Sequence, residues 1–91
     1  MKDLSKFYTR GFIKNPSLIR GNNGSLRLKF DLETLRETAP ITLKNDRVQF
    51  FLQNNNLNPK EKNTEQIIQE IEGKICFVYV DERKGFKLKV Q

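Results

Sequence analysis

Hydrophobic and polar residues alternate most regularly along residues 25–32. Every second side chain there is leucine or phenylalanine, and the side chains between them are polar or charged. A period of two residues predicts a strand with one face in the core and the other in solvent. The expected core face comprises Leu26, Leu28, Phe30 and Leu32, and the expected outward face comprises Ser25, Arg27, Lys29 and Asp31.

Four other segments have the composition of strands. Residues 6–14 are rich in aromatic and β-branched side chains, and Gly11 interrupts them where a kink or a bulge is expected. Residues 47–53 alternate again, with three apolar side chains on one face. Residues 74–80 are apolar on both faces, and a short polar loop joins them to the alternating residues 86–90. These last two segments predict a terminal β-hairpin.

One short helix is predicted over residues 64–72. Asn63 and Gln66 have the spacing of a capping box, and Gly73 follows the last helical residue, where a glycine ends many helices. The apolar side chains on its expected buried face are Ile67, Ile68 and Ile71.

Turn residues separate these elements. Residues 15–17 and 21–24 carry strong turn signals, so a loop or a loose hairpin is expected between the first two strands. Residues 33–46 fit either a helical turn or a strand, and the secondary structure of this segment is left open. Residues 54–63 are polar, contain a proline and predict an exposed loop.

The composition is that of one folded domain covering residues 1–91. Hydrophobic residues make up 36% of the chain and charged residues 31%, and the 91 residues are too few for two cores. The longest apolar run, residues 75–80, is too short to cross a bilayer, and the first residues do not resemble a signal peptide. We therefore expect a cytoplasmic protein without a membrane partner.

Several kinds of catalytic site are excluded by residue type. The chain has no histidine and one cysteine, so it cannot by itself build a zinc site or a Ser-His or Cys-His catalytic pair. Cys76 lies in the longest apolar run and is expected to be a buried, inert thiol. Asp31 and Glu33 have the spacing of magnesium ligands on a strand, but carboxylates at a strand end are usually turn or solvent residues. We expect no enzyme, no metal and no cofactor.

Positive charge is concentrated at the two ends of the chain. Residues 1–30 hold seven Lys and Arg against one acid, and residues 73–91 hold five against two, whereas the middle carries a net charge of −3. If the ends meet in the fold, the net charge of +6 becomes a polarised basic surface that attracts phosphates. The alternative is a basic surface that only keeps the protein soluble.

Three stretches resemble OB-fold single-strand-binding proteins: residues 10–16 leading into 26–32, residues 65–76 with a short helix entering a strand through a glycine, and residues 84–88 as a closing strand. The resemblance implies a mostly β fold with one short helix, in which five strands form an OB-like Greek-key barrel. The chain has no tryptophan and lacks the acidic start of the first connection, so it is similar to a divergent phage or plasmid type rather than to the bacterial family itself.

An OB barrel binds single strands across its second and third strands, between two loops. The resemblance therefore implies a site in which basic side chains neutralise phosphates and aromatic rings stack on bases. The candidate residues are Arg10, Lys14, Arg20, Arg27, Lys29, Arg47, Phe51, Tyr79, Arg83 and Lys84.

Each part of this site has a structural alternative. Phe51 either stacks on a base from the polar face of its expected strand or is buried in the core. Arg27 and Lys29 either bind phosphates or only solubilise an exposed strand. The expected function is sequence-tolerant binding of single-stranded DNA, or less readily RNA. The alternative is a small phage or mobile-element protein, like the anti-CRISPR proteins, that inhibits a host defence complex through protein contacts.

Overall fold

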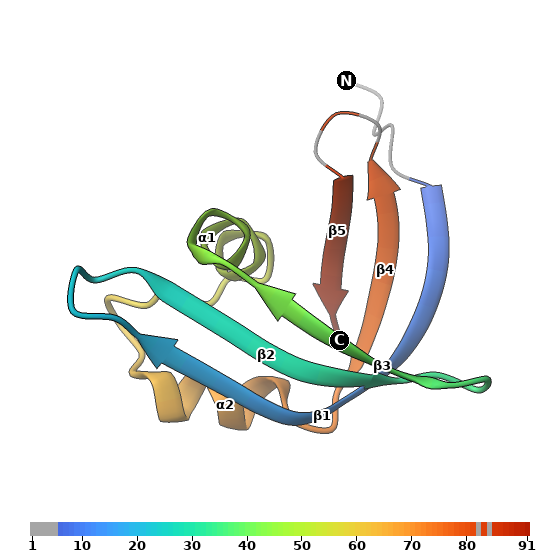
Figure 1. The fold of residues 1–91 in the computed structure, drawn as a ribbon, viewed down its shortest axis with the longest axis horizontal. Helices are drawn as coiled ribbons and strands as arrows, with labels where there is room; N and C mark the ends of the chain where they lie inside the picture. Colours follow the sequence, from blue (N-terminus) through green and yellow to red (C-terminus); the bar gives the residue numbers. More distant parts are fainter. Residues whose placement is uncertain (1–5, 82, 84) are drawn as a thin grey trace.

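The computed structural model describes residues 6–81, 83 and 85–91. It shows one sheet of five antiparallel strands in the order β3-β2-β1-β4-β5, with two helices between β3 and β4 in the chain (Figure 1). The expectation of a mostly β fold is confirmed, but the sheet does not close into a barrel. The strands are β1 (Lys6–Arg20), β2 (Leu26–Glu33), β3 (Thr38–Leu43), β4 (Ile75–Asp81) and β5 (Gly85–Val90), and the helices are α1 (Asn45–Asn54) and α2 (Thr64–Ile71).

Strand β1 joins the two halves of the sheet. Its first half pairs with β4 and its second half pairs with β2, and Phe12 is in register with residues of both strands. At this crossing the strands approach closely, because a Cβ on Gly11 would lie 2.7 Å from the backbone oxygen of Glu33. The kink expected at Gly11 is therefore a close strand contact that only glycine permits.

The expected loop after residue 14 is a bulge inside β1. Asn15 has a φ of 51° and the register with β2 shifts between Lys14 and Ser17, yet the strand continues to Arg20. A bulge increases the local twist of a strand. Residues 21–24 do form the expected reversal, with a backbone hydrogen bond of 3.0 Å from Gly24 to Gly21.

The prediction of a strand at residues 47–53 is wrong, because these residues lie in α1. The segment left open, residues 33–46, supplies β3 instead. The side chains that α1 buries are Val48, Phe51 and Leu52, at the spacing of one helical face. The helix places this face against the core side of the sheet, so its apolar residues are covered without a further strand.

The expected second strand, capped helix and terminal hairpin are confirmed, whereas the loop expected to be exposed at residues 54–63 contributes the buried Leu57 to the core. The core face of β2 is buried as expected, and Arg27 and Lys29 point outward. Helix α2 begins with the capping box of Asn63 and Gln66 and is followed by Gly73 at a φ of +75°. The terminal hairpin of β4 and β5 is present, and Cys76 is fully buried within it.

The sheet stays open because neither of its edge strands offers a regular row of backbone partners. On β3, Pro40 lacks the N–H group that a neighbouring strand would need. On β5, side chains at the end of α1 and just after it occupy the edge. Asn54 and Asn55 donate to the Leu88 oxygen at 3.3 and 3.0 Å, and Asn55 accepts from the Val90 N–H at 2.8 Å. A largely apolar groove of about 800 Å³, the seam groove, separates the core faces of β3 and β5.

Two further findings concern the part of the chain that is described. Neither helix there has the length and apolar character needed to cross a bilayer. Within the same residues, no three acidic or cysteine side chains gather where a metal ion could bind.

Candidate nucleic-acid interface

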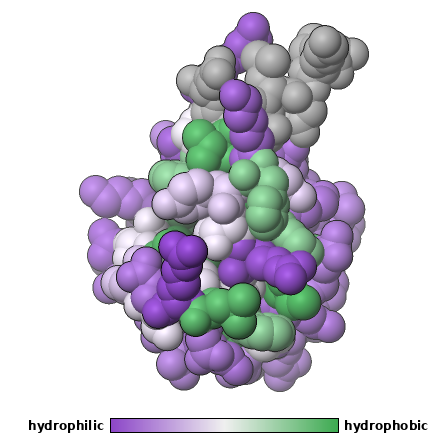
Figure 2. All heavy atoms as spheres, turned by 90° about the vertical axis from the view of Figure 1, so that its right-hand side faces the viewer, coloured by the Kyte–Doolittle hydropathy of each residue, from purple (hydrophilic) through white to green (hydrophobic). Residues whose placement is uncertain are grey.

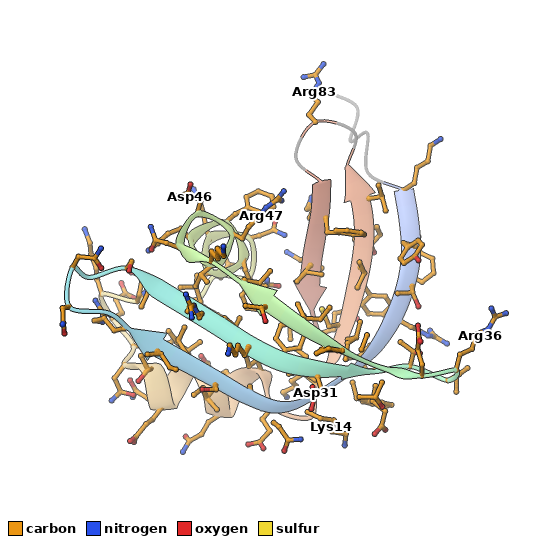
Figure 3. All side chains as sticks on the ribbon, viewed as in Figure 1. Lys14, Asp31, Arg36, Asp46, Arg47 and Arg83 are labelled. Atoms are coloured by element: carbon orange, nitrogen blue, oxygen red, sulfur yellow. The ribbon has the colours of Figure 1, made fainter. Side chains whose placement is uncertain are left out.

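The predicted site residues fall into separate groups on the structure. The first group lies where β1 and β2 pair, on the face of the sheet opposite the core. We call this the outward face. Lys29 is in register with Ser17, and Lys14 with Asp31. Lys14 and Asp31 lie together in Figure 3, and Asn15 donates to the Asp31 carboxylate at 3.4 Å. The outward face of β2 is therefore basic in its first half, at Arg27 and Lys29, and acidic in its second half.

The second group lies on the outward face where β1 and β4 pair. Arg10 is in register with Phe77, and Tyr79 with Phe7. The Phe7 ring lies 6.3 Å from the Phe77 ring and 5.9 Å from the Tyr79 ring, measured between centroids. Tyr79 thus belongs to an aromatic cluster with Phe7 and Phe77, and Arg10 is on the strand pair that carries this cluster.

The third group lies apart from the others. Arg83 is in the turn between β4 and β5, and Arg47 on α1 reaches the same end of the molecule, since a Cβ on Gly85 would lie 2.7 Å from its Nη2 atom. Figure 3 shows both arginines far from Lys14 and Arg36. Arg83 therefore does not share a surface with Lys14.

Arg20 is exposed at the end of β1. Lys84 lies outside the described residues.

Phe51 does not contribute to an interface in this fold. Its side chain is 2% exposed and lies in the core on α1, between Val48 and Leu52. The interpretation that it stacks on bases depended on an exposed strand face that does not exist. Of the two alternatives for this residue, burial is the one that the structure shows.

A bulge decides which aromatic side chains of β1 face outward. The register with β4 shifts between Phe7 and Thr9, so Phe7 turns outward onto the β4 rings. Tyr8 turns to the seam groove, where its ring centroid lies 6.1 Å from that of Phe86. In a strand without a bulge Tyr8 would share a face with Arg10 and Phe12, but here Phe7 takes this position instead.

The outward face is hollowed beside the turn that joins β2 to β3. A cleft of about 690 Å³, here called the outward cleft, lies between this turn and the first half of β1. Figure 2 shows apolar side chains separated by strongly hydrophilic ones on this side of the molecule. Among the residues that line the outward cleft are Phe7, Arg10, Phe12, Glu33, Leu35, Arg36 and Ile75.

Large apolar side chains are unusually exposed in the outward cleft. Phe7 is 57% exposed, Phe12 is 45% exposed, and Leu35 at the tip of the turn is fully exposed. An apolar cleft with arginines beside it is typical of an interaction site rather than of a solvated surface. Lys14 extends the cleft along β1, because its Nζ atom lies 5.8 Å from the centroid of the Phe12 ring. This distance is within the range of a cation–π contact.

The outward cleft includes residues that sequence analysis did not select. Phe12 was not among the candidate site residues, although the alternation of its strand puts it on a mixed face with Arg10. Leu35 and Arg36 lay in the segment left open. Their only signal in the sequence is an arginine beside a leucine in a short polar turn, which is too common to indicate a site.

Cys76 is unsuited to nucleophilic chemistry. Burial raises the pKa of its thiol from 9.0 to about 12, and a hydrogen bond with the backbone of Lys89 opposes this only in part. The reactive thiolate is therefore scarce near neutral pH.

Comparisons of the chain with protein-family models, with curated proteins and with solved structures give no match. The interpretation of the outward cleft therefore depends on its own geometry and charge.

Proposed function

We propose that this protein binds single-stranded nucleic acid, with DNA preferred, along the outward face of β1 and its neighbours β4 and β2. The observation that carries the proposal is the outward cleft, which half-exposed phenylalanine rings and arginine side chains line together. Proteins that bind single strands without strict sequence preference combine these two features, because rings stack on bases and cations neutralise phosphates.

The outward side chains of β1 provide a continuous path. Phe7, Arg10, Phe12 and Lys14 follow one another along the strand, and β2 places Lys29 beside Ser17 further along. A strand lying on this path would meet rings at one end and cations along its length. A duplex is a poorer ligand, since its bases already stack on one another and cannot reach the rings.

The strand order supports the same proposal. β1 pairs with both β2 and β4, and the helices lie between β3 and β4 in the chain. This order is compatible with an OB-like barrel that is open between β3 and β5. Such barrels bind single strands across their second and third strands, and the proposed path shares β2 with that site. The third group of basic residues, near Arg83, lies outside the proposed path.

The first test uses the salt dependence of binding. Labelled single-stranded DNA is titrated by fluorescence anisotropy at several salt concentrations with the wild type and with the double variant Arg27→Glu, Lys29→Glu. Each phosphate contact contributes about 0.7 to the slope of log K against log salt for single strands, so the double variant is expected to bind more weakly and to lose about 1.4 from the slope. The same titration with RNA of equal sequence tests the preference for DNA.

The control is Lys60→Glu, Lys62→Glu, which makes the same change in charge on the segment before α2. Because Lys62 pairs with Glu70 at 2.6 Å, the urea midpoint of this variant is measured alongside its binding. This variant is expected to keep the wild-type slope. Equal slopes for the two double variants would remove β2 from the site. Absence of binding by the wild type at low salt would overturn the proposal and favour the protein-binding alternative, for which the seam groove with exposed Tyr8 and Phe86 is the surface to examine.

The second test concerns stacking. Phe12→Leu keeps an apolar side chain but removes the aromatic face, so binding is expected to weaken by about 1 to 3 kcal/mol. Ile19→Leu is the control, because Ile19 is a similarly exposed apolar residue of β1 that has no ring. Equal affinities of these two variants would exclude Phe12 as a stacking residue.

A further inference from the structure

We infer that the outward cleft binds a guanine base of the strand and that Glu33 is the residue that determines this preference. The inference rests on the proposed function and adds a specific base to a binding mode that is otherwise tolerant of sequence. The observation behind it is a single carboxylate among the apolar and cationic side chains of the cleft.

Glu33 lies next to Phe12, the phenylalanine that we expect to stack on a base. It is in register with Phe12 across β1 and β2, and directly opposed residues of antiparallel strands have Cβ atoms about 5 Å apart. The close approach at Gly11 fixes the backbone of the two strands there, since no side chain separates Gly11 from the Glu33 carbonyl. The Glu33 side chain is exposed, so it can reach a base that lies on the Phe12 ring.

The carboxylate of Glu33 is available as a hydrogen-bond acceptor. Arg10 and Arg36 line the same cleft, but among the residues that the structure describes Glu33 forms no ion pair. The neighbouring hydroxyl of Thr34 is already engaged: it donates to the Glu37 oxygen at 2.8 Å and accepts from the Arg36 and Glu37 N–H groups at 3.3 and 3.1 Å. Glu33 is therefore the strong acceptor of the cleft.

An ionised carboxylate accepts hydrogen bonds and repels phosphate, so it favours a base edge over the backbone of the strand. Guanine presents an N–H and an amino group side by side on its Watson–Crick edge, and these can donate to both oxygens of one carboxylate. Adenine and cytosine present an amino group next to an acceptor nitrogen, and thymine presents one N–H between two carbonyl oxygens. Guanine is thus the base that matches Glu33, while Arg10 and Arg36 attract the adjacent phosphates.

The experiment measures base preference with oligothymidine that carries one central substitution. Oligonucleotides with guanine, hypoxanthine, adenine or cytosine at that place are compared with unsubstituted oligothymidine by fluorescence anisotropy. Guanine is expected to improve binding by about 5- to 140-fold, the usual discrimination of a two-bond contact. Hypoxanthine, which lacks the amino group, is expected to give a smaller improvement.

The variant Glu33→Gln tests the residue itself. An amide has one acceptor oxygen and a donor group, so the preference for guanine is expected to disappear while oligothymidine binds at least as tightly as before. Glu37→Gln is the matched control, because Glu37 belongs to the same turn but lines the seam groove. This control is expected to keep the guanine preference, and both changes are at exposed positions that the fold tolerates.

The outcomes separate the inference from the proposed function. Equal binding of guanine and thymine oligonucleotides by the wild type, or a preference that survives Glu33→Gln, would overturn the inference and leave single-strand binding intact. No binding of any oligonucleotide would overturn the proposed function. Competition by free guanosine monophosphate as strong as that by the guanine oligonucleotide would show that a free nucleotide, and not a strand, is the ligand.

Discussion

Replacement of Phe51 by alanine is expected to destabilise the protein strongly while removing no ligand contact. The ring is 2% exposed, and its helical neighbours Val48 and Leu52 are 0% and 1% exposed. The helix backbone there is held further by Asn55, whose side chain donates to the Phe51 oxygen at 2.8 Å. Because these neighbours cannot easily collapse into the space left by the ring, we expect a loss of about 3 to 5 kcal/mol.

This loss is a large part of the stability of a small domain, which is typically about 5 to 15 kcal/mol. For a chain of this size it corresponds to a fall in melting temperature of roughly 12 to 40 °C. The direct measurement is urea denaturation followed by circular dichroism, with the free energy of unfolding taken from midpoint and slope. Phe51→Leu is expected to cost less than about 1.5 kcal/mol, because leucine restores most of the apolar volume.

Phe12→Ala is the matched control, since Phe12 is a 45% exposed phenylalanine in the outward cleft. It is expected to shift the urea midpoint much less than Phe51→Ala and to weaken binding of single-stranded DNA instead. The reasoning would be refuted if Phe51→Ala kept the wild-type midpoint but lost DNA binding. That result would place the Phe51 ring on the surface and contradict the packing of α1.

Three shorter predictions test other parts of the fold. Gly11→Ala should lower the free energy of unfolding by about 3 kcal/mol, because the new Cβ would meet the Glu33 backbone oxygen. Gly24→Ala, at a φ of +82° with open space around it, should lower it by only about 1 kcal/mol. Equal losses in urea denaturation would contradict the close strand contact. The raised pKa of Cys76 means that the thiol keeps its proton to a higher pH in the folded state than in the unfolded state. The contribution of this thiol to stability is therefore complete below pH 9.0 and is lost as the pH rises towards about 12. The free energy of unfolding is expected to fall by up to about 1.4 kcal/mol per pH unit in this range. A Cys76→Ala variant whose stability falls with pH in the same way would disprove this linkage. Asn63→Ala should cost about 1 kcal/mol by removing the cap of α2, and an unchanged urea midpoint would show that the cap contributes nothing.

The sequence alone predicted the elements whose local signals agree with one another. In β2 the alternation of leucine with charged residues permits only one orientation of the strand, because a shift by one residue would bury Arg27 and Lys29. In α2 the capping box and Gly73 mark both ends of the helix independently of its surroundings. The outward position of Arg27 and Lys29, and hence part of the candidate interface, follows from these local rules.

The segment that became α1 shows where local rules fail. Its apolar residues fit a period of two at Val48, Phe50 and Leu52, and they also fit one helical face at Val48, Phe51 and Leu52. Both patterns are present in the same seven residues, so only the surroundings can choose between them. The curved sheet leaves its core face uncovered, and a helix covers this face while satisfying its own backbone hydrogen bonds.

The outward cleft was decided by the tertiary structure. The Phe7 ring faces outward because a bulge at Tyr8 changes the register of β1 and β4, and a bulge depends on the partner strand as much as on its own residues. The wall of the cleft forms because the turn after β2 places Leu35 and Arg36 beside a strand more than twenty residues earlier in the chain. Side-chain periodicity fixes which face of an isolated strand is apolar, but the pairing of distant strands fixes which apolar and charged residues share a surface.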